Sequence, residues 1–392
     1  MPVTMATAQA ALKNYYMGVL VDQLNTKINP FYNEIKSSNK DVQGMQVVKL
    51  APYGVNGGVA AGSETGALPQ AGGNNYIQFV SGLKNFYGTI QISDKAIKAS
   101  KGDAGSFVRL LSNEMKGLMV AAKFNFGRQI FTDGSGVLTL TGAEIVPGFV
   151  LPVISTQYLI EGMTVDFRNV AGAIIAGGAK RRIEAVNRIT GTIRIDANGV
   201  ALATAADDFL TVQDSYQLEL TGLASIFSSG ALYGVDRADN PWMVPYANAT
   251  AIGAISDVKI QAAIDYLDEI VGSTVNYIST ASGVKRAYQE YMELTRRNVN
   301  TLDMKGGFKA ISFNGLPLLN DRFMPASTMD LHNTKEYTFH SMNDWEWMNM
   351  DGGTIFEKVA GFPLWTATIA KYAELICDHP GGQARLTGVT EV

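Results

Sequence analysis

The sequence has little of the chemistry that catalysis, metal binding or secretion would use. One of its 392 residues is cysteine, three are histidine and 17% are charged, against roughly 25% in a typical soluble domain. The single cysteine, Cys377, excludes an intramolecular disulfide, and no second cysteine is present to help build a zinc site. The low charge predicts either a surface covered by other subunits or one rich in Ser, Thr, Asn and Gly.

Long runs of one kind of residue are also absent. The 32 basic and 36 acidic residues give a net charge of −4 and form no basic run, so tight DNA binding by charge neutralisation is not expected. No window reaches the roughly 18 apolar residues of a membrane span. The first residues lack a basic segment followed by an apolar one, so we predict no secretory signal and folding in a reducing cytoplasm.

Apolar residues make up 46% of the chain, enough for a large core, and the length suits two or three domains. An apolar stripe at helical spacing predicts a first helix within residues 8–25, which Asn29-Pro30 would end.

A pair of strands, 46–50 and 76–80, flanks a glycine- and alanine-rich stretch from Pro52 to Asn75, and a further strand is expected at 85–92. Isolated hairpins are only marginally stable in water. We therefore expect this hairpin to lie against something else, and a neighbouring subunit is the natural candidate.

A long helix is predicted from Ala104 to Phe131, with Asp103 as its N-cap and a stop at Thr132–Gly136. Its length would be about 40 Å. The apolar face comprises Phe107, Leu110, Leu111, Met115, Leu118, Ala122 and Ile130.

Residues 137–222 alternate short strands with turns. This pattern favours a small β-barrel or sandwich, long enough to be a separate domain. The strands are expected at 137–141, 163–167, 181–186, 192–196, 209–212 and 217–220.

Helices and strands alternate after residue 222, which indicates an α/β layer. One amphipathic helix should run from Ser256 to Gly272 and a second from Ser282 through Leu294. Strands are expected at 275–278 and 308–313, followed by a returning antiparallel sheet at 336–340, 354–359 and 364–375, with a turn at 351–353.

No catalytic, cofactor-binding or metal-binding residue is predicted. His332, His340 and His379 have no metal-ligand spacing, and Cys377 is expected to be a buried structural thiol rather than a nucleophile. No Gly-Lys-Ser/Thr occurs, and Asp133-Gly-Ser-Gly136 follows a helix instead of leading from a strand into one, which excludes both phosphate-loop motifs.

Two charged groups have ordinary explanations. Asp265, Asp268 and Glu269 should form the solvent face of their helix. The cluster Gly177–Arg182 is expected to be a solvated turn, with contact to an anionic partner as the alternative.

The order of these parts resembles the major capsid proteins of tailed bacteriophages, which share the Hong Kong 97 fold. Two segments are the most suggestive, Tyr233-Gly-Val-Asp-Arg237…Asn240-Pro-Trp242 and Phe313-Asn-Gly-Leu-Pro…Asp321…Pro325. The resemblance implies an α+β chain divided as follows: 1–40 N-terminal arm, 41–93 E-loop, 94–136 spine helix of the peripheral domain, 137–222 inserted β-rich domain, 223–250 connection, 251–334 axial α/β domain and 335–392 peripheral sheet.

This resemblance implies a structural protein without cofactor or enzymatic activity. It would assemble as hexamers and pentamers into an icosahedral virion shell, in the bacterial host cytoplasm, around double-stranded DNA held by non-specific contact only. A scaffolding protein, a portal and a cement protein are the implied partners, with no membrane. The chain starts almost directly with the arm, which implies a separate scaffold or prior cleavage.

Covalent cross-linking through the E-loop, which occurs in some relatives, is not expected. Residues 51–75 contain no lysine, and Lys49 and Lys84 only flank them. We expect overlapping arms and loops to stabilise the shell, and residues 137–222 to face outward as a stabilising or decorating domain.

Three alternatives remain open. They are an encapsulin-type compartment shell of the same fold, a tail-tube or other phage structural protein, and an enzyme that uses residues 137–222 as a binding module.

Overall fold

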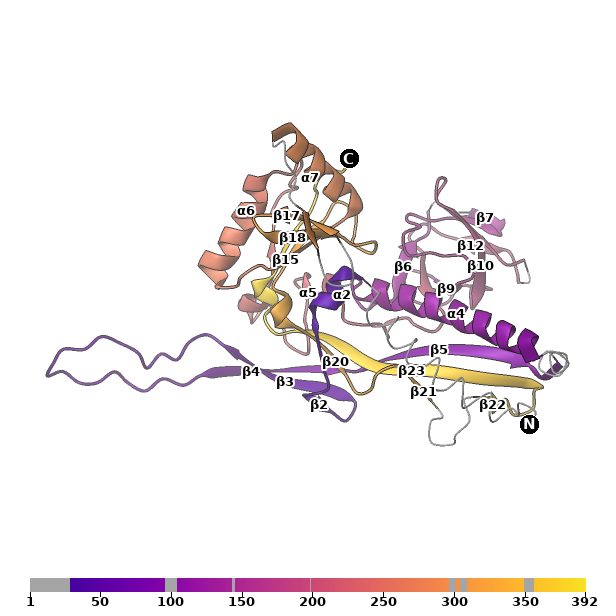
Figure 1. Cartoon of the computed structure of the whole chain (residues 1–392), viewed down its shortest axis with the longest axis horizontal. Helices are drawn as coiled ribbons and strands as arrows, with labels where there is room; N and C mark the ends of the chain where they lie inside the picture. The colour runs from indigo at the N-terminus through magenta and orange to yellow at the C-terminus, as the bar shows by residue number, and fades with distance from the viewer. Residues whose placement is uncertain are drawn as a thin grey trace.

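The computed structural model describes residues 29–95, 104–142, 145–197, 199–295, 301–303, 309–348 and 356–392. The helix expected at 8–25, the Asp103 cap and the turn at 351–353 lie outside these residues. Within them the chain is α+β, as predicted, with a long helix, a long projecting hairpin and three larger sheets (Figure 1).

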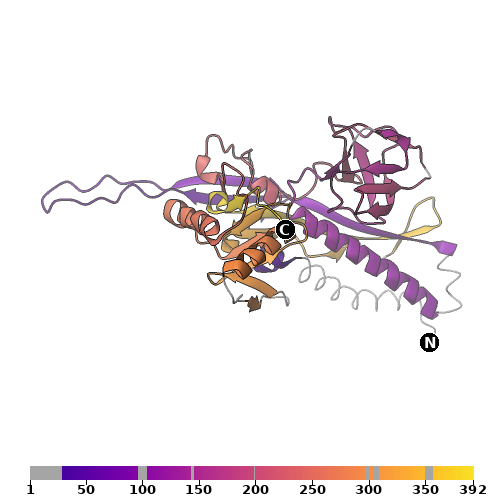
Figure 2. The ribbon, with the colours of Figure 1, turned by 90° about the horizontal axis from the view of Figure 1, so that it is seen from above.

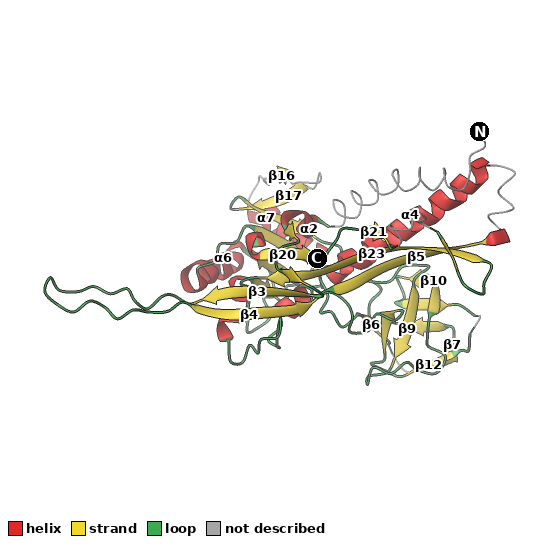
Figure 3. Ribbon diagram, turned by 90° about the horizontal axis from the view of Figure 1, so that it is seen from below, coloured by secondary structure: helices red, strands yellow, loops and turns green. Residues whose placement is uncertain are grey.

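The longest strand, β23, organises a six-stranded sheet. It pairs antiparallel with β5 from Leu364↔Ser93 to Ala373↔Lys84, and at its other end with β20. Figure 3 shows β5 and β23 side by side along the molecule. The strands are β1 (Lys36–Ser38), β5 (Lys84–Ser93), β20 (Tyr337–Ser341), β21 (Glu346–Trp347), β22 (Glu357–Lys358) and β23 (Leu364–Cys377).

The long helix α4 (Ala104–Gln129) confirms its prediction and lies along this sheet (Figure 1). Its Phe126 ring packs edge-on against Phe86 of β5, with 5.2 Å between ring centroids. Met115 and Ile130 are buried and Leu118 and Ala122 half-buried, as expected, while the side chains of Phe107, Leu110 and Leu111 lie outside the described part.

Two glycines let the chain turn sharply after α4. Gly134 and Gly136 have φ of +83° and +80°, where glycine is favoured. A Cβ on Gly134 would lie 2.9 Å from the Leu220 carbonyl oxygen, and one on Gly136 would lie 2.7 Å from that of Ser215. The segment that returns from the barrel, which includes Ser215 and Leu220, therefore leaves no room for a side chain at either glycine. This explains why the helix is followed by glycines, as predicted.

The predicted hairpin is formed by β3 (Gln46–Tyr53) and β4 (Asn75–Gly82), paired antiparallel from Gln46↔Gly82 to Tyr53↔Asn75. The short β2 (Val42–Gln43) pairs with β3. Residues 54–74 contain no strand and project from the molecule as one long loop (Figures 1 and 2). We call residues 46–82 the long hairpin.

The strands within residues 137–212 close into a barrel. Its order is β6-β13-β9-β10-β11-β8, and a bridge between Thr141 and Val153 joins the two outer strands. These strands and a separate β7–β12 pair are β6 (Val137–Leu140), β7 (Ile145–Gly148), β8 (Val150–Pro152), β9 (Thr164–Arg168), β10 (Arg181–Asn187), β11 (Thr192–Ile195), β12 (Leu202–Thr204) and β13 (Phe209–Val212).

The strand predicted at 217–220 is wrong. Gln217 has a φ of +60°, and Glu219 turns inward to pair with Arg128 of α4, so this segment leaves the barrel as a turn. Strands β7, β8 and β12, of three or four residues, were not predicted, although the equally short β6, β11 and β13 were.

A seven-stranded mixed sheet, with α6 and α7 beside it, forms the third part (Figure 1). The predicted helices are confirmed: α6 (Asp257–Tyr266) has Ser256 as N-cap and continues as a π-helical turn, η3 (Leu267–Val271), to Gly272, and α7 spans Ser282–Thr295. The strands are β14 (Tyr246–Ala247), β15 (Tyr277–Thr280), β16 (Thr301–Asp303), β17 (Lys309–Phe313), β18 (Leu316–Asn320), β19 (Met329–His332) and β24 (Ala384–Leu386).

Two details differ from the expectation. Leu294, expected on the apolar face of α7, is exposed. Strand β24 pairs with β19 and β14, so the segment 335–392 is divided between two sheets and does not lie wholly in the six-stranded one. The remaining short helices are α2 (Pro30–Glu34), α5 (Leu223–Ile226), η2 (Pro241–Met243), η5 (Thr334–Glu336) and η6 (Pro380–Gly382).

An aromatic cluster around Phe31 of α2 connects the sheets. Phe31 is fully buried, and its ring centroid lies 5.4 Å from that of Tyr337 in β20 and 5.9 Å from that of Tyr277 in β15. Phe131, just after α4, lies 6.2 Å away. The two sheets therefore share one core.

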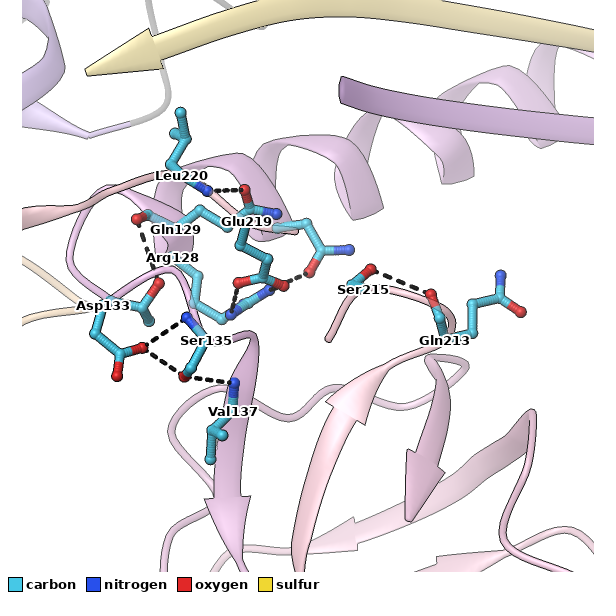
Figure 4. Close-up of polar contacts among 11 residues, drawn as sticks. Arg128, Gln129, Asp133, Ser135, Val137, Gln213, Ser215, Glu219 and Leu220 are labelled. Carbon is cyan, nitrogen blue, oxygen red and sulfur yellow. Dashed lines mark hydrogen bonds and ion pairs between the residues drawn. The ribbon is translucent and has the colours of Figure 1, made fainter. Parts of the chain in front are cut away.

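A buried ion pair attaches the barrel to α4 (Figure 4). The Arg128 guanidinium donates to both carboxylate oxygens of Glu219, at 2.8 Å and 2.5 Å, and both side chains are almost completely excluded from solvent. The backbone N–H of Leu220 donates to the Gln129 side chain, and that of Gln217 to the Ser135 carbonyl. The two chain ends of the barrel are thus held at one point.

We expect Glu219→Ala to lower the free energy of unfolding by about 3–5 kcal/mol, because it leaves the Arg128 charge buried without its partner. Urea denaturation of the unassembled subunit would measure the loss. The matched control is Glu161→Ala, which breaks the exposed Arg188–Glu161 pair and should cost at most about 1 kcal/mol. Equal losses in the two variants would contradict the importance of the buried pair.

Candidate assembly site

The three histidines lie in structural positions. His332 is buried between the Ser279 hydroxyl, 2.8 Å from Nε2, and the Tyr337 hydroxyl, 3.2 Å from Nδ1. Burial lowers its pKa well below the usual value, so the ring is neutral. His340 Nδ1 donates to the Lys40 carbonyl at 2.8 Å, and His379 lies 3.5 Å from the Glu336 carboxylate. Among the residues described, no three metal-ligating side chains gather at one point.

Cys377 is a buried structural thiol, as predicted. It is fully buried at the end of β23, and burial raises the pKa of the thiol well above its usual value. A reactive cysteine needs the thiolate, which this environment disfavours. The backbone N–H of Cys377 donates to the Tyr233 hydroxyl at 3.1 Å, and that hydroxyl donates to the Leu375 carbonyl at 3.0 Å.

Of the two predictions about charged groups, one is confirmed and the other holds only in part. Asp265, Asp268 and Glu269 are exposed, which confirms them as a solvent face. The basic cluster is only partly a solvated turn, because Arg181 is buried against Asp196, with 3.0 Å between Nε and the carboxylate. The exposed Lys180 pairs with Asp214 at 2.8 Å.

Two buried carboxyl groups were not predicted. Burial raises the pKa of Glu374 in β23 to about 7, and that of Asp321, just after β18, also to about 7. Glu374 accepts from the backbone N–H of Thr221 at 3.0 Å and lies 3.4 Å from the Ser81 hydroxyl of β4. The local sequence around Glu374 and Asp321 has no feature that would distinguish these buried acids from exposed ones.

The base of the long hairpin is fixed to its own chain. Tyr53, at the end of β3, stacks on Trp242 with the rings parallel and 5.1 Å between centroids. Phe79 of β4 is buried against Tyr233, and Lys49 pairs with Asp378 at 2.7 Å. The hairpin does lie against other structure, as expected, but its base is supported by its own chain and not by the neighbouring subunit that the sequence suggested as the candidate.

Within the part of the chain that the structure describes, the tip of the long hairpin has no such support. Val55, Val59 and Leu68 are 86%, 89% and 90% exposed, on a loop with one charged residue, Glu64. Nearer the base, Met45, Leu50 and Tyr76 are also exposed. Clustered exposed apolar side chains typically mark a protein–protein contact surface. The tip is therefore the best candidate functional site.

The sequence matches no family model and no curated protein. Solved structures do match. The capsid asymmetric unit of cyanophage A-1(L) aligns with a TM-score of 0.55 over 94% of this chain and 92% of that one, at 11% identity. The chain has the fold of a tailed-phage capsid protein.

Two further matches are weaker. The capsid of a native GTA particle has a TM-score of 0.47 over 92% of this chain and 90% of that one, at 12% identity. The SrpI encapsulin complex from Synechococcus elongatus PCC 7942 has a TM-score of 0.49 over 93% and 89%, at 8% identity.

The Hong Kong 97-type fold is thereby confirmed, on the likeness to the A-1(L) capsid protein. The division into arm, E-loop, spine helix, insertion, axial domain and peripheral sheet stays a prediction. In that division the long hairpin lies within the E-loop and α4 is the spine helix. No helix among the described residues is long and apolar enough to cross a membrane.

We expect the stability of the subunit to fall as the pH rises from about 4.5 to about 7. In this range the folded protein retains the Glu374 proton, while the unfolded chain has lost it. Glu374→Gln should flatten this part of the profile and stabilise the protein at about pH 8. Urea unfolding at several pH values would measure both effects.

Asp321 changes stability in the same direction, because its pKa is raised from 3.8 to about 7. Asp321→Asn is therefore the companion variant, and the double variant should have the flattest profile. A profile unchanged by either substitution would contradict the assignment of these acids.

Proposed function

We propose that this chain is the major capsid protein of a tailed phage. It assembles as hexamers and pentamers into an icosahedral shell around double-stranded DNA, and its place is the virion capsid, built in the host cytoplasm. The capsid fold supports this proposal together with one observation, the unsupported apolar tip of the long hairpin. A lone subunit gains nothing from such a loop, whereas a shell buries it on a neighbouring subunit.

The chemistry of the chain supports a structural rather than an enzymatic role. His332, His340 and Cys377 are engaged in core or backbone contacts, His379 lies beside the Glu336 carboxylate, and the two acids whose pKa is raised to about 7 are buried within the fold. The absence of a basic run supports non-specific contact with the packaged DNA. A scaffolding protein, a portal and a cement protein remain the proposed partners.

Electron microscopy of the purified protein, with and without a candidate scaffold, tests the proposal. Closed regular shells, or rings of five and six subunits, are the expected result. A protein that stays monomeric under all these conditions would overturn it. The contents of the shell would distinguish the two functions, because DNA indicates a virion and enzyme cargo indicates a compartment.

We expect the triple variant Val55→Ser, Val59→Ser, Leu68→Ser to prevent assembly while leaving the subunit folded. All three side chains are exposed in the subunit, so its free energy of unfolding should change by no more than about 0.5 kcal/mol each. Each would lose about 1.5–3 kcal/mol of burial in a neighbouring contact. Light scattering would follow assembly, and circular dichroism the fold.

The matched control is Val170→Ser, Ile189→Ser, Val200→Ser, three apolar side chains of the barrel that are 72%, 97% and 71% exposed. This control should still assemble. Shells of normal yield from the hairpin variant would contradict a role of the tip in assembly.

A further inference from the structure

The barrel touches two parts of the molecule that are far apart in the sequence. One contact, described above, joins its chain ends to the C-terminal end of α4 through Arg128 and Glu219. The other joins residues 155–160, a barrel loop between β8 and β9, to residues 321–325, the loop that follows β18 of the seven-stranded sheet.

The second contact is made of three hydrogen bonds to three consecutive carbonyl groups. The Gln157 side-chain amide donates to the carbonyls of Arg322 and Met324, both at 2.8 Å. The Tyr158 hydroxyl donates to the carbonyl of Phe323, also at 2.8 Å. Both donor side chains are half-buried, and the bonds to Met324 and Phe323 are partly shielded from solvent, whereas the bond to Arg322 is exposed.

Helix α4 takes part in the same contact. Phe323 packs edge-on against Phe124 of α4, with 5.3 Å between centroids, and the Arg322 guanidinium lies 4.9 Å from the Phe124 ring centroid. Barrel, helix and loop therefore meet at one place.

This place is separate from the main connection between the sheets. The Phe31 cluster reaches α4 at its end, through Phe131, whereas the loop contacts Phe124. Phe124 lies five residues before the helix ends at Gln129, about 7.5 Å along its axis, and Phe131 follows in the turn. Two bodies joined by a single packed contact can rotate about that contact. A second contact, displaced along the helix, resists the rotation.

We propose that residues 155–160 of the barrel act as a brace, which fixes the angle between the seven-stranded sheet and the body formed by α4 and the six-stranded sheet. Gln157 and Tyr158 are its positioning residues. The barrel moves with α4, because a buried ion pair and backbone hydrogen bonds hold both of its chain ends. Resting on the proposed function, the brace would also set the curvature of the shell.

Hydrogen exchange in the unassembled subunit tests the brace without reference to assembly. In Gln157→Ala, Tyr158→Phe, amides of residues 321–328 should exchange at least about tenfold faster, because the three hydrogen bonds that hold this loop to the barrel are lost. Barrel amides should be unchanged. Arg188→Ala, which breaks a barrel ion pair outside the contact, is the matched control and should leave residues 321–328 unaffected.

The second readout is the shell. Electron microscopy should show a broader range of shell diameters for the double variant than for the parent and the Arg188→Ala control. Unchanged exchange in residues 321–328 together with unchanged diameters would overturn the brace. If the parent forms no shells, the proposed function fails while the exchange result still decides the brace.

A barrel that unfolds in the double variant would show fast exchange throughout residues 137–212. Tyr158→Phe alone keeps the ring and removes only the hydroxyl, and it then decides the question. Faster exchange limited to residues 321–328 supports the brace, and parental exchange there opposes it.

Discussion

Strands β5 and β23 pair along ten consecutive residue positions, although 271 residues separate Ser93 from Leu364. The positions of several other elements depend on this pairing. It provides the surface on which α4 packs, and it sets the direction of β4, which precedes β5 with one residue between them. The long hairpin projects where it does because β5 is held to β23. Long-range pairing of this kind forms late and slowly, since loop closure must precede it.

Polar groups join the segments that cross this sheet. Glu374 of β23 connects the hairpin, through Ser81, with Thr221, where the chain returns from the barrel. Tyr233 uses its hydroxyl to bind the end of β23 and its ring to cover Phe79 of β4. Buried polar contacts contribute little net free energy, but each is costly to leave unpaired. They therefore favour one arrangement of the crossing segments over others.

The burial of apolar side chains differs between the parts of the subunit. Most parts bury them within one chain, whereas the hairpin tip leaves them exposed. The base of the hairpin, the barrel interior and the Phe31 cluster are buried within one chain. The hairpin tip is not, and its glycine-rich backbone has no strand to stiffen it. In the proposed shell, a subunit with this division would fold before assembly and use the glycine-rich tip as its contact surface with a neighbour.

The sequence by itself determined the longer elements and their order. Helical periodicity predicted α4, α6 and α7 nearly to their ends, and alternation predicted the hairpin strands, since both signals are local. Short strands were found only in part: β6 and β13 were predicted and β7 and β12 were missed, because three or four residues carry little periodicity. It also predicted that the histidines and Cys377 form no metal or nucleophile constellation.

Only the tertiary structure decided which distant residues meet. The Arg128–Glu219 pair, the raised pKa values of Glu374 and Asp321, the place of β24 in the seven-stranded sheet and the support of the hairpin base by Trp242 all depend on long-range contacts. Burial is a property of the folded chain, and a glutamate on a strand has the same local sequence signal whether it faces water or the core.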